Sequence, residues 1–167
     1  MSADRLPPER EPNILGAVVH GPAMIAESVG IAIAVRCIFA KPDGLEIDLA
    51  LRAIGVQAEA AVRQTFGTSP RGQSGDQATS MWHGGSEPVL LVEVDGRRVL
   101  ADPQGSTSSG GDEVFASDLQ VAVAELPLDG SITFTASWPE AGLAEGSVTL
   151  ALETFDDLEN KIIRLPS

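Results

Sequence analysis

The chain has 167 residues, one cysteine, 43% hydrophobic residues, and 11 basic against 24 acidic residues, a formal net charge of −13. This length and hydrophobic content predict one domain with a core large enough to fold without stabilising cross-links. Because Cys37 is the single cysteine, an intrachain disulfide is excluded. No Lys or Arg occurs between Arg98 and Lys161, so that segment contributes −12 of the charge. Such a surface repels phosphate backbones and argues against nucleic-acid binding.

The first 13 residues are polar, contain two consecutive prolines, and lack the basic-then-apolar order of a secretory signal. We expect residues 1–13 to form a flexible arm ahead of a single domain over residues 14–167. Residues 14–35 are mostly small and apolar, but a histidine, a proline and a glutamate interrupt them, so we predict no membrane span. These features favour a cytoplasmic location.

Residues 31–54 give the clearest structural signal, two alternating runs joined by a Lys-Pro-Asp-Gly turn. Successive side chains of a strand face opposite sides, so each run should bury one of its faces. In the first run the inward set is Ile31, Ile33, Val35, Cys37 and Phe39, and in the second run it is Leu45, Ile47, Leu49 and Leu51. The sequence therefore predicts an antiparallel hairpin whose apolar face needs a second layer, with the thiol of Cys37 buried and inert.

The segments around this hairpin are less regular. Residues 14–20 indicate a short strand, and residues 21–29 a connection. Residues 55–66 are rich in alanine and place Glu59 four residues before Arg63, which favours a short helix, although an irregular strand extension competes.

A Gly-, Ser- and Pro-rich stretch at residues 67–88 predicts a long surface loop. It contains Met81, Trp82 and His83 in succession. Either Trp82 packs against the body of the domain and so anchors the loop, which we favour, or Trp82 and His83 contact a ligand or partner. These two residues are the candidate binding residues of the sequence.

The second half of the chain predicts further strands. Residues 89–101 form a second hairpin around Asp95-Gly96, because a type I′ turn needs positive φ twice. A second loop is expected over residues 102–117, followed by three alternating strands, of which one ends at Trp138-Pro139. Near the end of the chain we expect one helical turn.

Seven or eight strands without regular strand–helix alternation predict an all-β, antiparallel two-layer sandwich of immunoglobulin-like or jelly-roll-like type, with at most one or two short helices. A partly closed barrel is the alternative architecture. The cysteine pair of antibody-like domains is missing from the sequence.

Three pieces of the chain carry a resemblance that spans most of residues 31–152. They are an alternating strand after a Pro-containing turn, an Asp-Gly-Arg hairpin, and a strand that ends in Trp-Pro ahead of a Gly and a Glu. Here these are residues 44–52, Asp95-Gly96-Arg97, and Trp138-Pro139 with Gly142 and Glu145. Together they resemble a group of uncharacterised all-β proteins of high-GC Gram-positive bacteria. The resemblance implies the fold and no activity.

The sequence offers few residues for catalysis or metal binding. His20 and His83 are the only histidines, and neither lies in a metal-ligand pattern. No nucleophile elbow or phosphate-binding loop is present. Clustered loop carboxylates could hold Ca²⁺, which takes six to eight oxygens, the candidates being Asp112, Glu113, Asp156, Asp157 and Glu159. We expect no catalytic residues, no metal ligands and no cofactor.

The leading functional hypothesis is a non-enzymatic module that binds an unknown partner protein or self-associates. Recognition would use the loop bearing Trp82 and His83, or a sheet edge that takes a partner strand. One alternative is an enzyme of hydrolase type or a small-ligand carrier with a site assembled from loops, and another is a calcium-dependent module.

Overall fold

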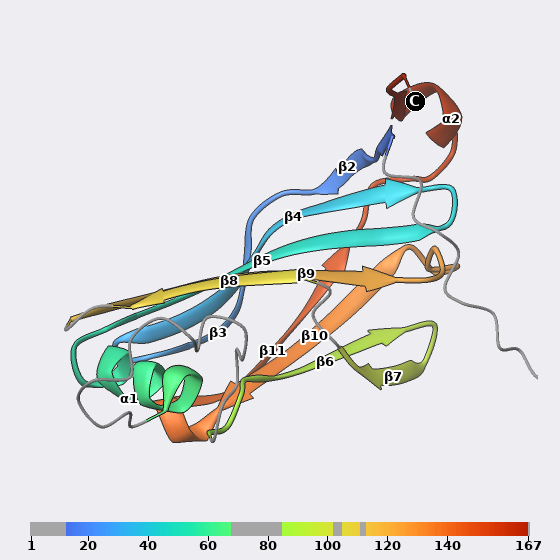
Figure 1. Ribbon diagram of the computed structural model, residues 1–167. Helices are drawn as coiled ribbons and strands as arrows, with labels where there is room; N and C mark the ends of the chain where they lie inside the picture. The colour runs from blue at the N-terminus through green and yellow to red at the C-terminus, as the bar shows by residue number, and fades with distance from the viewer. Residues whose placement is uncertain (1–12, 68–84, 102–104, 111–112, 167) are drawn as a thin grey trace, which may run out of the picture.

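The computed structural model describes residues 13–67, 85–101, 105–110 and 113–166 (Figure 1). In chain order, the elements are β1 (Ile14–Leu15), β2 (Ala17–His20), β3 (Ala23–Ser28), β4 (Ile31–Lys41), β5 (Gly44–Ile54), α1 (Gly55–Phe66), β6 (Val89–Val94), β7 (Arg97–Leu100), β8 (Gly105–Gly110), β9 (Val114–Val123), β10 (Ser131–Trp138), the 3₁₀ turn η1 (Pro139–Ala141), β11 (Leu143–Ala151), α2 (Leu158–Lys161) and β12 (Ile163–Arg164).

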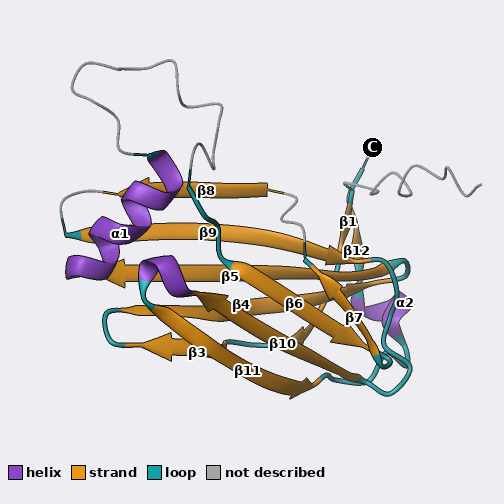
Figure 2. Cartoon of the chain, turned by 90° about the horizontal axis from the view of Figure 1, so that it is seen from below, coloured by secondary structure: helices purple, strands orange, loops and turns teal. Residues whose placement is uncertain are grey.

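The strands form two stacked antiparallel sheets, which confirms the predicted sandwich (Figure 2). The first sheet has the order β2-β4-β5-β9-β8, with β3 also paired to β4. The second sheet has the order β11-β10-β6-β7. A short ribbon of β1 and β12 joins the two ends of the described chain.

The core lies between the two sheets and follows the alternation of the sequence. In β5 the four inward aliphatic side chains are at most 2% exposed, as predicted: Leu45, Ile47, Leu49 and Leu51. Across the core, Phe134 and Trp138 of β10 are fully buried, and Trp138 makes an edge-to-face contact with Phe115 of β9. One continuous cluster of buried residues therefore joins both sheets.

In β4 the predicted alternation is correct up to Val35 and wrong beyond it. The ladder to β5 pairs Val35 with Leu49 but Cys37 with Asp48, so one extra residue, Arg36, is accommodated in a β-bulge. Ile38 is consequently the buried residue, at 0% exposure, while Cys37 lies beside Asp48 on the outer face and is partly buried.

Two regions expected to be irregular are strands. Residues 23–28 of the predicted connection form β3, which pairs with the first half of β4. Residues 102–117, predicted as a loop because of their Gly and Ser content, include β8 and the start of β9. In both cases neighbouring strands supply the ladder partners that the local composition does not indicate.

The ambiguous segment after β5 is the helix α1, which covers one end of the sandwich (Figure 1). Ala58 and Ala61 are fully buried in the common core, and the helix packs against β5, β9 and η1. The other turn predictions are confirmed. Asp95 and Gly96 both have positive φ between β6 and β7, and β10 ends at Trp138 where Pro139 begins η1.

Candidate functional site

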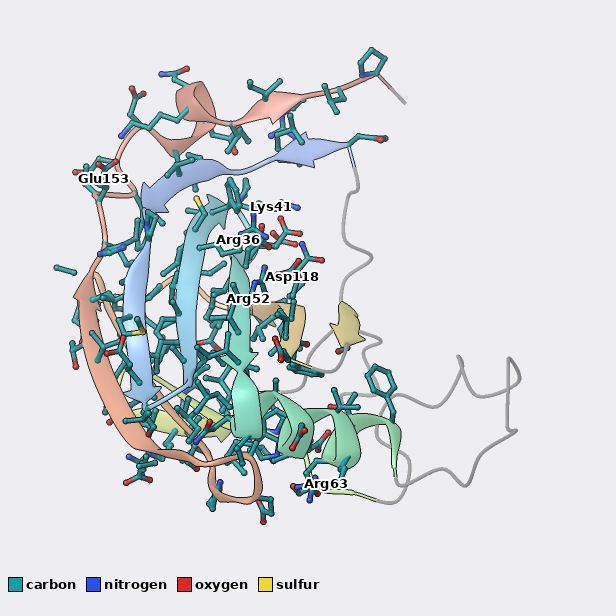
Figure 3. The ribbon with its side chains drawn as sticks, turned by 90° about the vertical axis from the view of Figure 1, so that its left-hand side faces the viewer. Arg36, Lys41, Arg52, Arg63, Asp118 and Glu153 are labelled. Atoms are coloured by element: carbon teal, nitrogen blue, oxygen red, sulfur yellow. The ribbon has the colours of Figure 1, made fainter. Side chains whose placement is uncertain are left out.

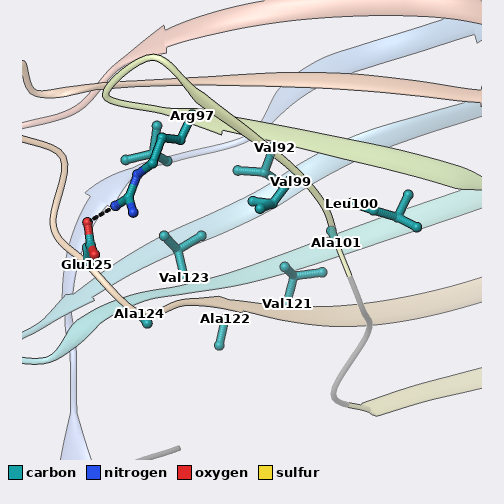
Figure 4. A pocket seen from close by; sticks show the side chains of 11 residues that line it. Val92, Arg97, Val99, Leu100, Ala101, Val121, Ala122, Val123, Ala124 and Glu125 are labelled. Carbon is teal, nitrogen blue, oxygen red and sulfur yellow. Dashed lines mark hydrogen bonds and ion pairs between the residues drawn. The ribbon is translucent and has the colours of Figure 1, made fainter. Parts of the chain in front are cut away.

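An apolar groove of about 360 Å³ lies between the β6–β7 hairpin of the second sheet and the end of β9 in the first sheet (Figure 4). Valine is the most frequent residue in its walls, as Val92, Val94, Val99, Val121 and Val123. Strands β6, β7 and β9 position these residues because inward-facing side chains recur at every second position of each strand.

The β7 side of the groove carries apolar side chains that remain in solvent. Val99 stands opposite Val92 in the ladder, so both face the first sheet. Val92 is 1% exposed whereas Val99 is 58% exposed, and the next residue, Leu100, is 68% exposed. The difference arises because β7 is the last strand of its sheet and stands at the mouth of the groove.

The end of β9 forms the other side of the mouth. β8 pairs with β9 from Phe115 to Gln120, and the last three residues of β9 extend beyond this ladder. On the side away from β5, no strand within the described ranges pairs with residues 121–123. The groove is therefore bordered by the edge of β7 in one sheet and by the end of β9 in the other.

An ion pair crosses the groove at the end near the β6–β7 turn. The guanidinium of Arg97 donates to the carboxylate of Glu125, which follows β9 (Figure 4). This hydrogen bond raises the pKa of Arg97, and the charges of Glu125 and Asp95 act in the same direction. Asp95 in turn accepts the backbone N–H of Leu128 at 2.9 Å, and Leu128 itself is 95% exposed.

The candidate binding residues Trp82 and His83 lie outside the described residues. The chain next to that segment is held firmly. The indole N–H of the fully buried Trp138 donates to Ser86 Oγ at 3.0 Å, and Ser86 Oγ donates to Gln64 Oε1 at 2.9 Å. The segment that follows residue 84 is thereby fixed to both the core and α1.

Among the described residues, the other side chains considered for chemistry do not converge on one site, and Asp112 lies outside the described ranges. His20 Nδ1 lies 2.8 Å from the carbonyl oxygen of Gly21 at the end of β2. Burial, and secondarily the charge of Asp48, raise the pKa of Cys37 and disfavour its thiolate. Among the residues that the structure describes, no three His, Cys, Asp or Glu side chains converge as metal ligands would. The described helices include none with the length and apolar character needed to cross a membrane.

Charged side chains lie on the outer face of the first sheet (Figure 3). Asp118 of β9 receives Arg52 of β5 at 2.9 Å and Arg36 of the bulge at 3.6 Å, and Arg52 also donates to the carbonyl oxygen of Ser117 at 3.2 Å. These groups are about half exposed, so each pair contributes little to stability. Their geometry ties β4, β5 and β9 together.

The groove is not predicted by the sequence patterns described above. Alternation alone would place Val99 on a buried face, because it does not show that β7 is the last strand of its sheet. One available signal was the pair Arg97-Arg98, since charged residues are common on edge strands. No local sequence pattern indicates that the end of β9 lies opposite β7.

Comparisons with known proteins add little. No family model matches the sequence, and neither does any curated protein. The crystal structure of bovine butyrophilin matches with 11% sequence identity and a TM-score of 0.34. The match covers 83% of this chain and 46% of the butyrophilin chain, so this chain spans less than half the length of that structure.

Proposed function

We propose that this protein is a non-enzymatic β-sandwich module that binds another protein through the groove between β7 and β9. The partner contributes an extended apolar segment that carries positive charge. The observation that supports the proposal best is the exposure of Val99, an inward-facing valine at the mouth of an apolar groove. Apolar surface of this kind marks interaction sites when it is continuous with a concavity.

The apolar surface continues from the groove onto the hairpin. Leu100 lies beside Val99, and Leu128 is tied by its backbone N–H to Asp95 in the β6–β7 turn. All three apolar side chains are more than half exposed. An extended segment can cover both the groove and this rim, whereas a compact small molecule would fill the groove alone.

Charge supports a foreign partner rather than a second copy of the chain. The net charge is −13, and at the turn end of the groove the three carboxylates of Asp95, Glu125 and Asp129 outnumber the two guanidinium groups of Arg97 and Arg98. Two copies would repel each other, while a positively charged segment would be attracted and steered toward this face.

The test uses a fluorescein-labelled seven-residue peptide, Lys-Thr-Val-Thr-Val-Thr-Lys, followed by fluorescence polarisation. We expect saturable binding that weakens at least tenfold in the variant Val99→Asp, since one lost apolar contact of about 1.4 kcal/mol is a factor of ten. Val114→Asp is the matched control, because Val114 is 57% exposed at the opposite end of β9. It should bind as the unmodified protein does.

Three results would contradict the proposal. Equal binding of a peptide with Ser in place of Val would show attraction by charge alone. Equal effects of the two Asp variants would place the site elsewhere. Dimers in light scattering that dissociate in Val99→Asp would identify the occupant as a second copy.

A further inference from the structure

We infer that the partner segment binds as an added strand, hydrogen-bonded to the free edge of β7. This inference rests on the proposed function and specifies how recognition occurs. The partner's backbone would extend the second sheet by one strand, and its alternate side chains would enter the groove over Val121 and Val123. Strand addition of this kind takes affinity from backbone hydrogen bonds and specificity from the alternate side chains.

The other sheet edges are less suited to a partner strand. β11 is closed off by β3: Ser28 Oγ accepts the backbone N–H of Ala144 at 3.0 Å, and a Cβ on Gly146 would lie 2.7 Å from the Cβ of Ala26. β2 already accepts a hydrogen bond from the chain after β11. β8 consists of Gly, Ser and Thr only, so β7 is the edge with apolar side chains beside a groove.

The register of the β6–β7 hairpin identifies the backbone groups that are available. Ala101 donates its N–H to the carbonyl oxygen of Leu90 at 2.8 Å. Bonded and non-bonded pairs alternate along an antiparallel ladder, so Val99 also bonds to β6, whereas Arg98 and Leu100 direct their N–H and C=O groups away from it. Within the described part of the chain, no strand pairs with that side of β7.

The edge of β7 offers an incoming strand a place in the second sheet, with the Arg97–Glu125 ion pair at the turn end of the groove. A partner strand would lie about 4.8 Å from β7, the usual spacing in a sheet, and would face the part of β9 that extends beyond β8. Its apolar residues would meet the valines of the groove, and its polar residues would meet solvent. Binding to this edge therefore requires that apolar and polar residues alternate along the partner segment.

The test replaces single backbone amides of the peptide Lys-Thr-Val-Thr-Val-Thr-Lys by esters, which removes one N–H donor without added bulk. We expect affinity losses of fivefold or more at every second position and losses below twofold at the positions between. In the protein, Arg98→Pro removes one outward N–H and is compatible with an edge position. It should weaken binding at least tenfold, whereas Arg98→Ala, which keeps the backbone donor, should bind within a factor of three.

The outcomes separate this inference from the proposed function. Uniform tolerance of all esters, with binding still lost in Val99→Asp, would overturn the added strand and leave the groove as the binding site. No binding of the unmodified peptide to the unmodified protein would overturn both. The ester series decides the question even where Arg98→Pro lowers the thermal midpoint, because it uses the unmodified protein.

Discussion

Deletion of Arg36 should be tolerated, although Arg36 lies in the middle of β4, one of the two long strands of the β4–β5 hairpin. Arg36 is the extra residue of the β-bulge, because Val35 pairs with Leu49 and Cys37 with Asp48. Without it, the two flanking pairs become consecutive and the ladder regular. Every residue after the bulge keeps its β5 partner and its face, so the core composition does not change. On the other side of β4 the one-residue mismatch falls at Gly21 and Pro22, which lie between β2 and β3 and have no partner in those ladders.

The cost of this deletion can be compared with that of a deletion two residues earlier. Loss of Arg36 removes an ion pair with Asp118 whose two side chains are 58% and 44% exposed, worth about 0–1 kcal/mol, and we expect less than about 2 kcal/mol in total. If the bulge closes after loss of Ala34, Arg36 takes the inward position of Val35 opposite Leu49. If the bulge stays, loss of Ala34 reverses the phase of the regular part of β4. It turns Ile31 and Ile33, now 3% and 0% exposed, toward solvent at about 1.5–3 kcal/mol each.

Urea denaturation followed by circular dichroism measures both deletions against the unmodified protein. The Arg36 deletion should fold with a modest shift of its midpoint. The Ala34 deletion should lose about 3–6 kcal/mol, which approaches the whole stability of a typical domain, about 5–15 kcal/mol. If the two deletions destabilise the protein equally, Arg36 is not an extra residue and the assignment of faces after Val35 is wrong.

Two further predictions concern buried groups. Trp138→Phe should lower the free energy of unfolding by about 1–3 kcal/mol, because it removes the hydrogen bond to Ser86 and leaves a smaller ring. A double-mutant cycle with Ser86→Ala should give a coupling energy of about 0.5–1.5 kcal/mol. Strictly additive effects of the two substitutions would count against the hydrogen bond. Alkylation of Cys37 by iodoacetamide should have a pH midpoint above that of a cysteine in an unstructured peptide, because burial and the charge of Asp48 raise the thiol pKa. Asp48→Asn should lower that midpoint without removing the shift, since burial is the larger cause, and an unchanged midpoint would exclude the role of Asp48.

The sequence predicts the sheets well because one physical signal decides them. Wherever a strand is half buried, its side chains alternate, and the inward residues of β5 follow this rule without exception. The turn at Asp95-Gly96 is equally local, since positive φ at two positions favours these residue types. These features depend only on neighbours in the chain, and a single sequence contains them.

The errors arise where two alternatives are nearly equal in hydrophobicity. In β4 the residues after Val35 read Arg-Cys-Ile-Phe-Ala, and either phase buries apolar side chains. The register with β5 selects the phase that buries Ile38, and no local pattern contains that register. Strand β8 illustrates the same limit, because its six residues of Gly, Ser and Thr have no apolar periodicity and are paired through β9 alone.

The groove depends on the same long-range contacts, and this has a consequence for binding. Val92 and Val94 are almost fully buried, so the core holds β6 in place, and the two-residue turn at Asp95 holds β7 against β6. The edge of β7 is therefore held in place before the proposed partner binds, and little conformational entropy remains to be lost on the side of this protein. Loosening the hairpin should weaken partner binding even where no contacting residue is changed.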